Sequence, residues 1–146
     1  MIEKIIRDGH ELALILRSEF NQDGIKFLTP QDYSQQLGYM KRPPGYIIEP
    51  HIHNLYPRSV SYTNEVLFIR SGLVRVDFYD QKKCYFSSAL LKSGDVILLI
   101  SGGHGFEILE ESVIIEVKQG PYAGELDKSR FNAENHQIVY WPKNEK

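Results

Sequence analysis

The stretch "RSGLVRVDFYD", residues 70–80, decides the fold class. Ser71 and Gly72 form a turn signal. After it, apolar residues alternate with polar ones: Val74, Val76 and Phe78 alternate with Arg75, Asp77 and Tyr79. Successive side chains of a strand point to opposite faces, so this alternation predicts a strand with one apolar face. We therefore expect a β-hairpin that turns at Gly72.

Similar segments recur along the chain as short apolar runs separated by turn residues. This pattern is typical of an all-β sandwich or barrel. We predict strands at residues 11–17, 36–41, 46–53, 62–70, 73–80, 84–91, 96–100, 104–109, 112–117 and 137–141. A helix signal lies in residues 29–37, where Thr29 suits the N-cap, Pro30 the first helical position and Asp32 the positive end of the helix dipole. We therefore expect one short N-terminal helix.

Length and charge limit the class of protein. With 146 residues and a formal net charge of −2, the chain is long enough to bury a hydrophobic core and has no basic excess. We expect one domain over residues 1–146 that binds neither nucleic acid nor an anionic membrane surface. No signal peptide is recognisable, and the longest apolar run, residues 96–100, is too short to span a bilayer. The single cysteine, Cys84, excludes an intrachain disulfide, and we expect a cytoplasmic protein.

Two histidines stand two residues apart in "GYIIEPHIH", residues 45–53. On the predicted strand, His51 and His53 project from the same face. A His-x-His pair is common, and a lone histidine on an apolar face is more often a hydrogen-bonded core residue than a ligand. The pair alone therefore leaves metal binding, proton transfer and a structural role open.

Two further residues raise the same question. Glu65 begins an apolar run, where a carboxylate is costly to bury unless it is paired, protonated or bound to a cation; an exposed strand end is the alternative. His104 lies between glycines and shares a face with Phe106 and Ile108; a surface turn histidine is the alternative. Three imidazoles and one carboxylate together suit a divalent transition metal (Fe, Mn, Co, Ni or Zn) and suit Ca²⁺ or Mg²⁺ poorly.

The order and spacing of these residues resemble the first motif of the cupin superfamily. Gly45, five further residues and the pair His51 and His53 follow that motif, as do Glu65, six further residues and Gly72. One departure is the gap of eleven residues between His53 and Glu65, where the family has three or four.

The second cupin motif is matched more loosely. Gly94 opens it and His104 stands at its histidine, with one residue fewer between them than in the family. Ile100 replaces the proline of the family, and Ile108 replaces its asparagine. The two motifs cover residues 45–108, with a C-terminal tail over residues 119–146.

The resemblance implies a jelly-roll barrel (a double-stranded β-helix) with a site in its mouth. It also implies one bound divalent transition metal, a small-molecule substrate and a homodimer. The residues that match the family's metal ligands are His51, His53, Glu65 and His104. Residues 118–131, "KQGPYAGELDKSRF", are similar to a group of single-domain cupins associated with bacterial surface-polysaccharide and modified-sugar pathways.

The insertion between His53 and Glu65 is expected to form a loop over the site. Tyr56 and Arg58 on this loop are candidates for binding a polar or anionic substrate. Glu49, which shares the face of the two histidines, and Tyr62 are candidates for moving a proton.

Three functions remain open. The first is a metal-dependent isomerase or epimerase that acts on a sugar or nucleotide-linked sugar. The second is a metal-free nucleotide-sugar ketoisomerase that uses the His-x-His pair for acid–base work, although those enzymes have a lysine where Asn54 follows His53 here. The third is an iron dioxygenase or a non-catalytic ligand-binding or sensor protein.

Overall fold

The computed structural model describes residues 1–133 and 136–141. The described chain is all-β, with one 3₁₀ turn, η1, at Gly124–Leu126. It divides into two compact units: unit 1 comprises residues 1–20 and 62–146, and unit 2 comprises residues 21–61. Within the described part of the chain, no helix is long and apolar enough to cross a membrane.

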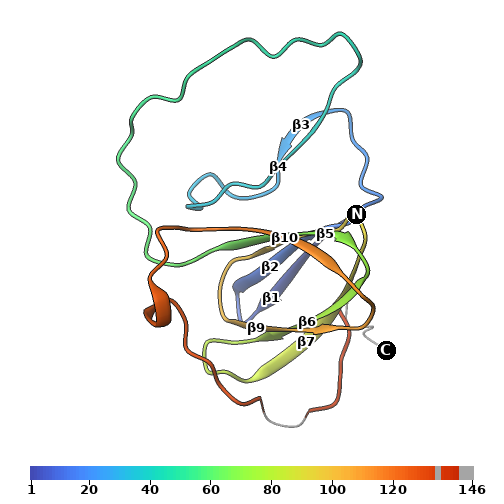
Figure 1. The fold of residues 1–146 in the computed structure, drawn as a ribbon, viewed down its shortest axis with the longest axis vertical. Helices are drawn as coiled ribbons and strands as arrows, with labels where there is room; N and C mark the ends of the chain where they lie inside the picture. The colour runs from blue at the N-terminus through green and yellow to red at the C-terminus, as the bar shows by residue number, and fades with distance from the viewer. Residues whose placement is uncertain (134–135, 142–146) are drawn as a thin grey trace. The chain divides into compact units, whose positions relative to one another are not determined.

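Unit 1 contains two antiparallel sheets. The larger sheet has the strand order β1-β2-β8-β5-β10 and the smaller has the order β7-β6-β9. Figure 1 shows them as two layers, with β9, β6 and β7 in one layer. The strand bounds are β1 Ile2–Arg7, β2 His10–Leu16, β5 Glu65–Ser71, β6 Leu73–Tyr79, β7 Tyr85–Lys92, β8 Val96–Leu99, β9 Gly103–Ile108 and β10 Val113–Lys118.

The hydrophobic core lies between these sheets. Ile69 and Ile97 from the larger sheet belong to the same buried cluster as Val76 and Phe78 from the smaller one, and each is at most 1% exposed. The predicted alternation in β6 is confirmed, because Val74, Val76 and Phe78 join this core. Burial of each such side chain contributes about 1.5–3 kcal/mol to stability.

The prediction of a β-hairpin at Gly72 is wrong. A turn is present, but β5 and β6 lie in different sheets, so Gly72 is a corner between the two layers. Gly72 has a φ of +91°, and a Cβ there would collide with Ser112 Oγ and the Glu111 carbonyl. The close approach of residues 111–112 thus requires glycine and redirects the chain into the second sheet.

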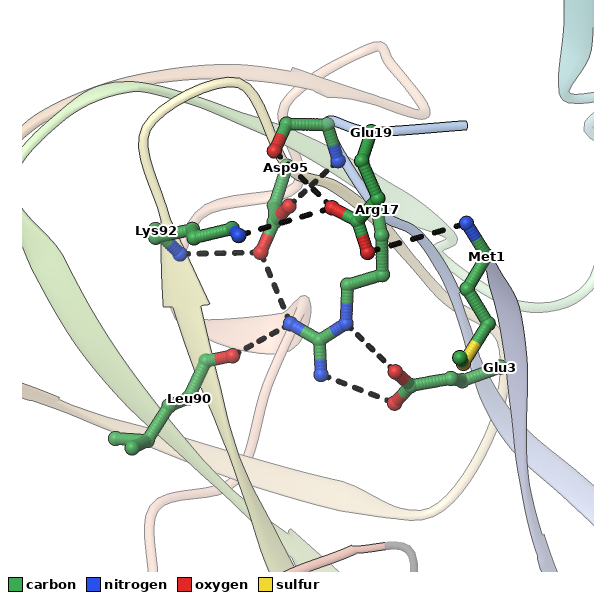
Figure 2. Close-up of polar contacts among 8 residues, drawn as sticks. Met1, Glu3, Arg17, Glu19, Leu90, Lys92 and Asp95 are labelled. Atoms are coloured by element: carbon green, nitrogen blue, oxygen red, sulfur yellow. Dashed lines mark hydrogen bonds and ion pairs between the residues drawn. The ribbon is translucent and has the colours of Figure 1, made fainter. Parts of the chain in front are cut away.

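A partly buried ion-pair network joins β1, the residue after β2 and the turn before β8 (Figure 2). Arg17 donates from Nε to Glu3 at 2.7 Å and from Nη1 to Asp95 at 2.9 Å. Asp95 is fully buried and also accepts hydrogen bonds from the backbone N–H groups of Ser18 and Lys92. Burial lowers the pKa of Arg17, but its hydrogen bonds to Glu3 and Asp95 outweigh this effect and raise the pKa. Asp95 therefore connects β2 to the turn that begins β8.

Unit 2 contains a two-stranded sheet of β3, Gly24–Phe27, and β4, Gly38–Lys41. The predicted helix over residues 29–37 is wrong, because this segment forms turns. The Gln36 amide donates to the carbonyl groups of Pro30 and Tyr33, and Thr29 Oγ1 accepts from the Leu37 N–H. These side-chain hydrogen bonds satisfy backbone groups locally and so compete with a helix.

Two predicted strands are also absent at their expected places. Residues 46–53 form no strand, and Ile47 and Ile52 are 80% and 88% exposed. An apolar pattern favours a strand only where a neighbouring strand pairs with it, and Pro50 in addition lacks an N–H group. Residues 137–141 form a single parallel bridge, between Ser88 and Tyr140, instead of a strand. Strands β1 and β3 were not predicted.

Candidate functional site

Glu65 and His104 come together within unit 1. Glu65 is the first residue of β5 in the larger sheet, and His104 is the second residue of β9 in the smaller sheet. Each is paired with a core residue, Glu65 with Leu99 and His104 with Phe78, so both side chains project between the two sheets. The structure thus joins two of the four predicted ligands from opposite layers.

The two side chains are in direct contact. His104 Nε2 lies 3.1 Å from Glu65 Oε2, and the side chains are 31% and 15% exposed, respectively. The hydrogen bond from His104 lowers the pKa of Glu65, while partial burial acts in the opposite direction. The positive charges of Lys118 and Lys128 also lower this pKa. Glu65 is therefore held as a carboxylate beside an imidazole, as a ligand pair or an acid–base pair requires.

The separation of the two atoms is compatible with shared metal ligation. Two ligand atoms that each lie about 2.1 Å from one transition-metal ion, at right angles, are about 3 Å apart. The imidazole nitrogen and carboxylate oxygen are donors that such ions accept. Among the described residues, however, no three His, Cys, Asp or Glu side chains form a group that could hold a metal. Unit 1 therefore supplies two of the predicted ligands.

The other predicted ligands, His51 and His53, lie in unit 2. Their ring centroids are 5.3 Å apart and the rings meet edge to face. His51 Nδ1 lies 3.0 Å from the Glu49 carbonyl oxygen. A carbonyl can only accept, so Nδ1 is the donor in this hydrogen bond. Histidines that bind metals commonly donate their second ring N–H in this way, which makes His51 suitable as an Nε2 ligand.

The remaining candidates are exposed. Glu49, Tyr56 and Arg58 lie in unit 2, where the Arg58 guanidinium is 5.5 Å from the centre of the Tyr56 ring. Tyr62 lies in unit 1 and is 75% exposed. Each of these side chains is accessible to a substrate.

Sequence reasoning missed several polar residues around Glu65. Lys118, the β10 partner of Glu65, lies 3.6 Å from Asp127 Oδ2, and Thr63 donates to Asp127 Oδ1 at 2.9 Å. Asn64 is buried and hydrogen-bonded to the end of β8. No motif marks these positions. For Asn64 the available signal was a polar residue just before a mainly apolar run.

A scan against protein-family models finds no match for this chain, and searches of the curated proteins and of the solved structures find none either.

Proposed function

We propose that the protein binds one divalent transition metal and acts on a small polar substrate, as an isomerase or epimerase of a sugar or nucleotide-linked sugar. The observation that carries the proposal is the contact between Glu65 and His104, 3.1 Å apart on strands of different sheets. The proposed ligand set is His51, His53, Glu65 and His104. The proposed ion is Fe, Mn, Co, Ni or Zn, because the set mixes nitrogen and carboxylate donors.

The chemistry proposed for the metal is that of a Lewis acid, which polarises a substrate carbonyl or hydroxyl group. The chain's own residues supply the remaining functions. Glu49 and Tyr62 are proposed to move the proton, and Tyr56 and Arg58 to bind polar or anionic groups of the substrate. The exposure of these four side chains supports an accessible role.

The metal proposal is tested by elemental analysis of the purified, untagged protein. Wild type is expected to hold one transition-metal ion per chain, and both His51→Ala/His53→Ala and Glu65→Gln/His104→Gln are expected to lose it. The matched control, His10→Ala/Glu111→Gln, changes one exposed histidine and one exposed glutamate and should retain the metal. Wild type that takes up none of the five metals on incubation would contradict the proposal.

A second candidate function is a metal-free nucleotide-sugar ketoisomerase, in which His51 and His53 do the acid–base work. The contact between the exposed His51 and His53 rings, whose centroids lie 5.3 Å apart, supports this alternative, because two accessible imidazoles can exchange protons with a substrate without any metal. Isomerisation of a nucleotide sugar by protein treated with a chelator would support it, and loss of turnover in His51→Ala/His53→Ala would assign the pair.

The proposal includes a jelly-roll barrel, a homodimer and a cytoplasmic location. In support of the barrel, the two sheets of unit 1 form two antiparallel layers, and Glu65 and His104 meet between them. In support of the dimer, Val113, Ile115 and Val117 form an exposed apolar row on β10, which ends the larger sheet. Light scattering tests the dimer.

A further inference from the structure

Asn64 connects the two chain segments that carry Glu65 and His104. It directly precedes β5, is 8% exposed, and donates from Nδ2 to the Ile100 carbonyl at 2.9 Å and to the Leu99 carbonyl at 3.4 Å. Leu99 ends β8, and its pairing with Glu65 is the last backbone pair of the β5–β8 ladder. The Asn64 side chain adds hydrogen bonds between the two segments just beyond that pair.

The same residue is fixed from the opposite side. Its backbone N–H donates to Gln119 Oε1 at 3.2 Å, and the Gln119 N–H donates to the Asn64 carbonyl at 3.3 Å. Gln119 directly follows β10, the other neighbour of β5. We call Asn64 and its partners Leu99, Ile100 and Gln119 the Asn64 clamp.

Short chain segments connect the Asn64 clamp to Glu65 and to His104. Asn64 is adjacent to Glu65, and the chain runs from Ile100 through a tight turn to His104. Gly102 in that turn has a φ of +73°, and a Cβ there would collide with the Tyr79 carbonyl, so the turn has little room to adjust. The buried carboxamide therefore links the start of β5 to the end of β8 and to Ile100, from which the chain turns into β9.

We propose that Asn64 is a positioning residue for this site: its carboxamide sets the separation of the Glu65 carboxylate and the His104 imidazole. The metal part of this inference rests on the proposed function, while the positioning part concerns the metal-free pair. Loss of the carboxamide removes a hydrogen-bond donor from the Ile100 and Leu99 carbonyls, and with it the side-chain link to the segment that leads into β9 and His104. Removal of groups that orient metal ligands changes metal affinity by about 10- to 100-fold.

The test compares Asn64→Ala with Thr63→Val, which removes the neighbouring hydrogen bond to Asp127 and leaves the clamp intact. In the metal-free protein, nuclear magnetic resonance follows the His104 Nε2 proton, which His104→Gln identifies by its absence. We expect slow exchange of this proton in wild type and Thr63→Val, and fast exchange in Asn64→Ala. We also expect Co²⁺ affinity to fall about 10- to 100-fold in Asn64→Ala alone.

A folded Asn64→Ala protein with unchanged proton exchange and unchanged Co²⁺ affinity would overturn the proposal. If Asn64→Ala does not fold, Asn64→Ser replaces the carboxamide by a shorter hydroxyl group, and the absence of an effect on proton exchange overturns the proposal equally. Wild type that protects the His104 proton and binds no Co²⁺ contradicts the proposed metal function, while the proton-exchange comparison still decides the role of Asn64.

Discussion

His104 Nε2 lies 3.1 Å from Glu65 Oε2, although the two residues are 39 positions apart in the sequence and belong to different sheets. A hydrogen bond of this kind stabilises the charged form of a partly buried carboxylate, and the pKa of Glu65 is accordingly lowered. The contact places a proton donor and an anionic oxygen between the two layers of unit 1.

The Glu65–His104 contact should be measurable as a coupling energy. In metal-free protein, a double-mutant cycle with Glu65→Gln and His104→Gln is expected to give about 1 kcal/mol of coupling in urea unfolding. The matched cycle uses Glu116 and Lys118, whose charged atoms are 3.9 Å apart on the same strand, and should give about 0.3 kcal/mol or less. Equal coupling in the two cycles would contradict a specific contact between Glu65 and His104.

Replacement of Arg17 should destabilise unit 1 strongly. Arg17→Met leaves the fully buried Asp95 without its cation, and we expect a loss of about 3 kcal/mol in the free energy of unfolding. Lys4→Met removes an ion pair whose lysine is 44% exposed, and should cost about 0.5 kcal/mol. Urea unfolding measures both variants; a similar loss in the two would show that the network in Figure 2 contributes little.

Asp77 should give the folded state a pH-dependent stability. Burial raises the pKa of Asp77, but hydrogen bonds from Arg75 and Ser88 outweigh it and lower the pKa. A carboxyl group whose pKa is lower in the folded state stabilises that state above its unfolded pKa, about 3.9, and loses this effect as the pH falls through the folded pKa. Asp77→Asn should therefore cost about 2 kcal/mol at pH 7 and progressively less below about pH 4.

Urea unfolding of wild type and Asp77→Asn between pH 2 and 7, run at constant ionic strength, measures this convergence. Glu107→Gln is the control, because it removes the more exposed carboxylate that also pairs with Arg75. A difference between wild type and Asp77→Asn that stays constant down to the lowest pH would contradict the assignment.

Gly72 should tolerate no side chain. Gly72→Ala places a methyl group against Ser112 and the Glu111 carbonyl at a φ of +91°, and we expect a loss of about 3 kcal/mol or more. Gly9→Ala has a similar φ, +79°, but open space around its Cβ, and should cost about 1 kcal/mol. The difference between the two isolates the steric requirement of the corner, and equal losses would show that backbone strain alone accounts for both.

The all-β class was predictable because alternation is a local signal. In β6, Val74, Val76 and Phe78 face the core as the pattern requires. The sheet to which β6 belongs was not predictable in the same way. Whether the chain forms a hairpin or crosses to another sheet at Gly72 depends on residues 111–112, which approach the turn from far along the sequence.

The predicted strand and the predicted helix are both wrong because local sequence alone does not determine whether such an element forms. Residues 46–53 have the composition of a strand, but a strand also needs a neighbour to pair with. Residues 29–37 begin like a helix, but the Gln36 side chain bonds the carbonyl groups of Pro30 and Tyr33 instead. In the candidate site, the chemistry of Glu65 and His104 was recognisable from residue type and spacing. Asn64 was not, since its role arises from hydrogen bonds to residues 99, 100 and 119.

The most direct test of the proposed metal site is a crystal structure of the metal-loaded protein, with anomalous data collected at the absorption edge of the bound metal. We expect one peak about 2.0–2.2 Å from His104 Nε2 and from a Glu65 carboxylate oxygen. A protein that binds one metal ion per chain but shows no anomalous peak next to Glu65 and His104 would contradict the proposed metal site.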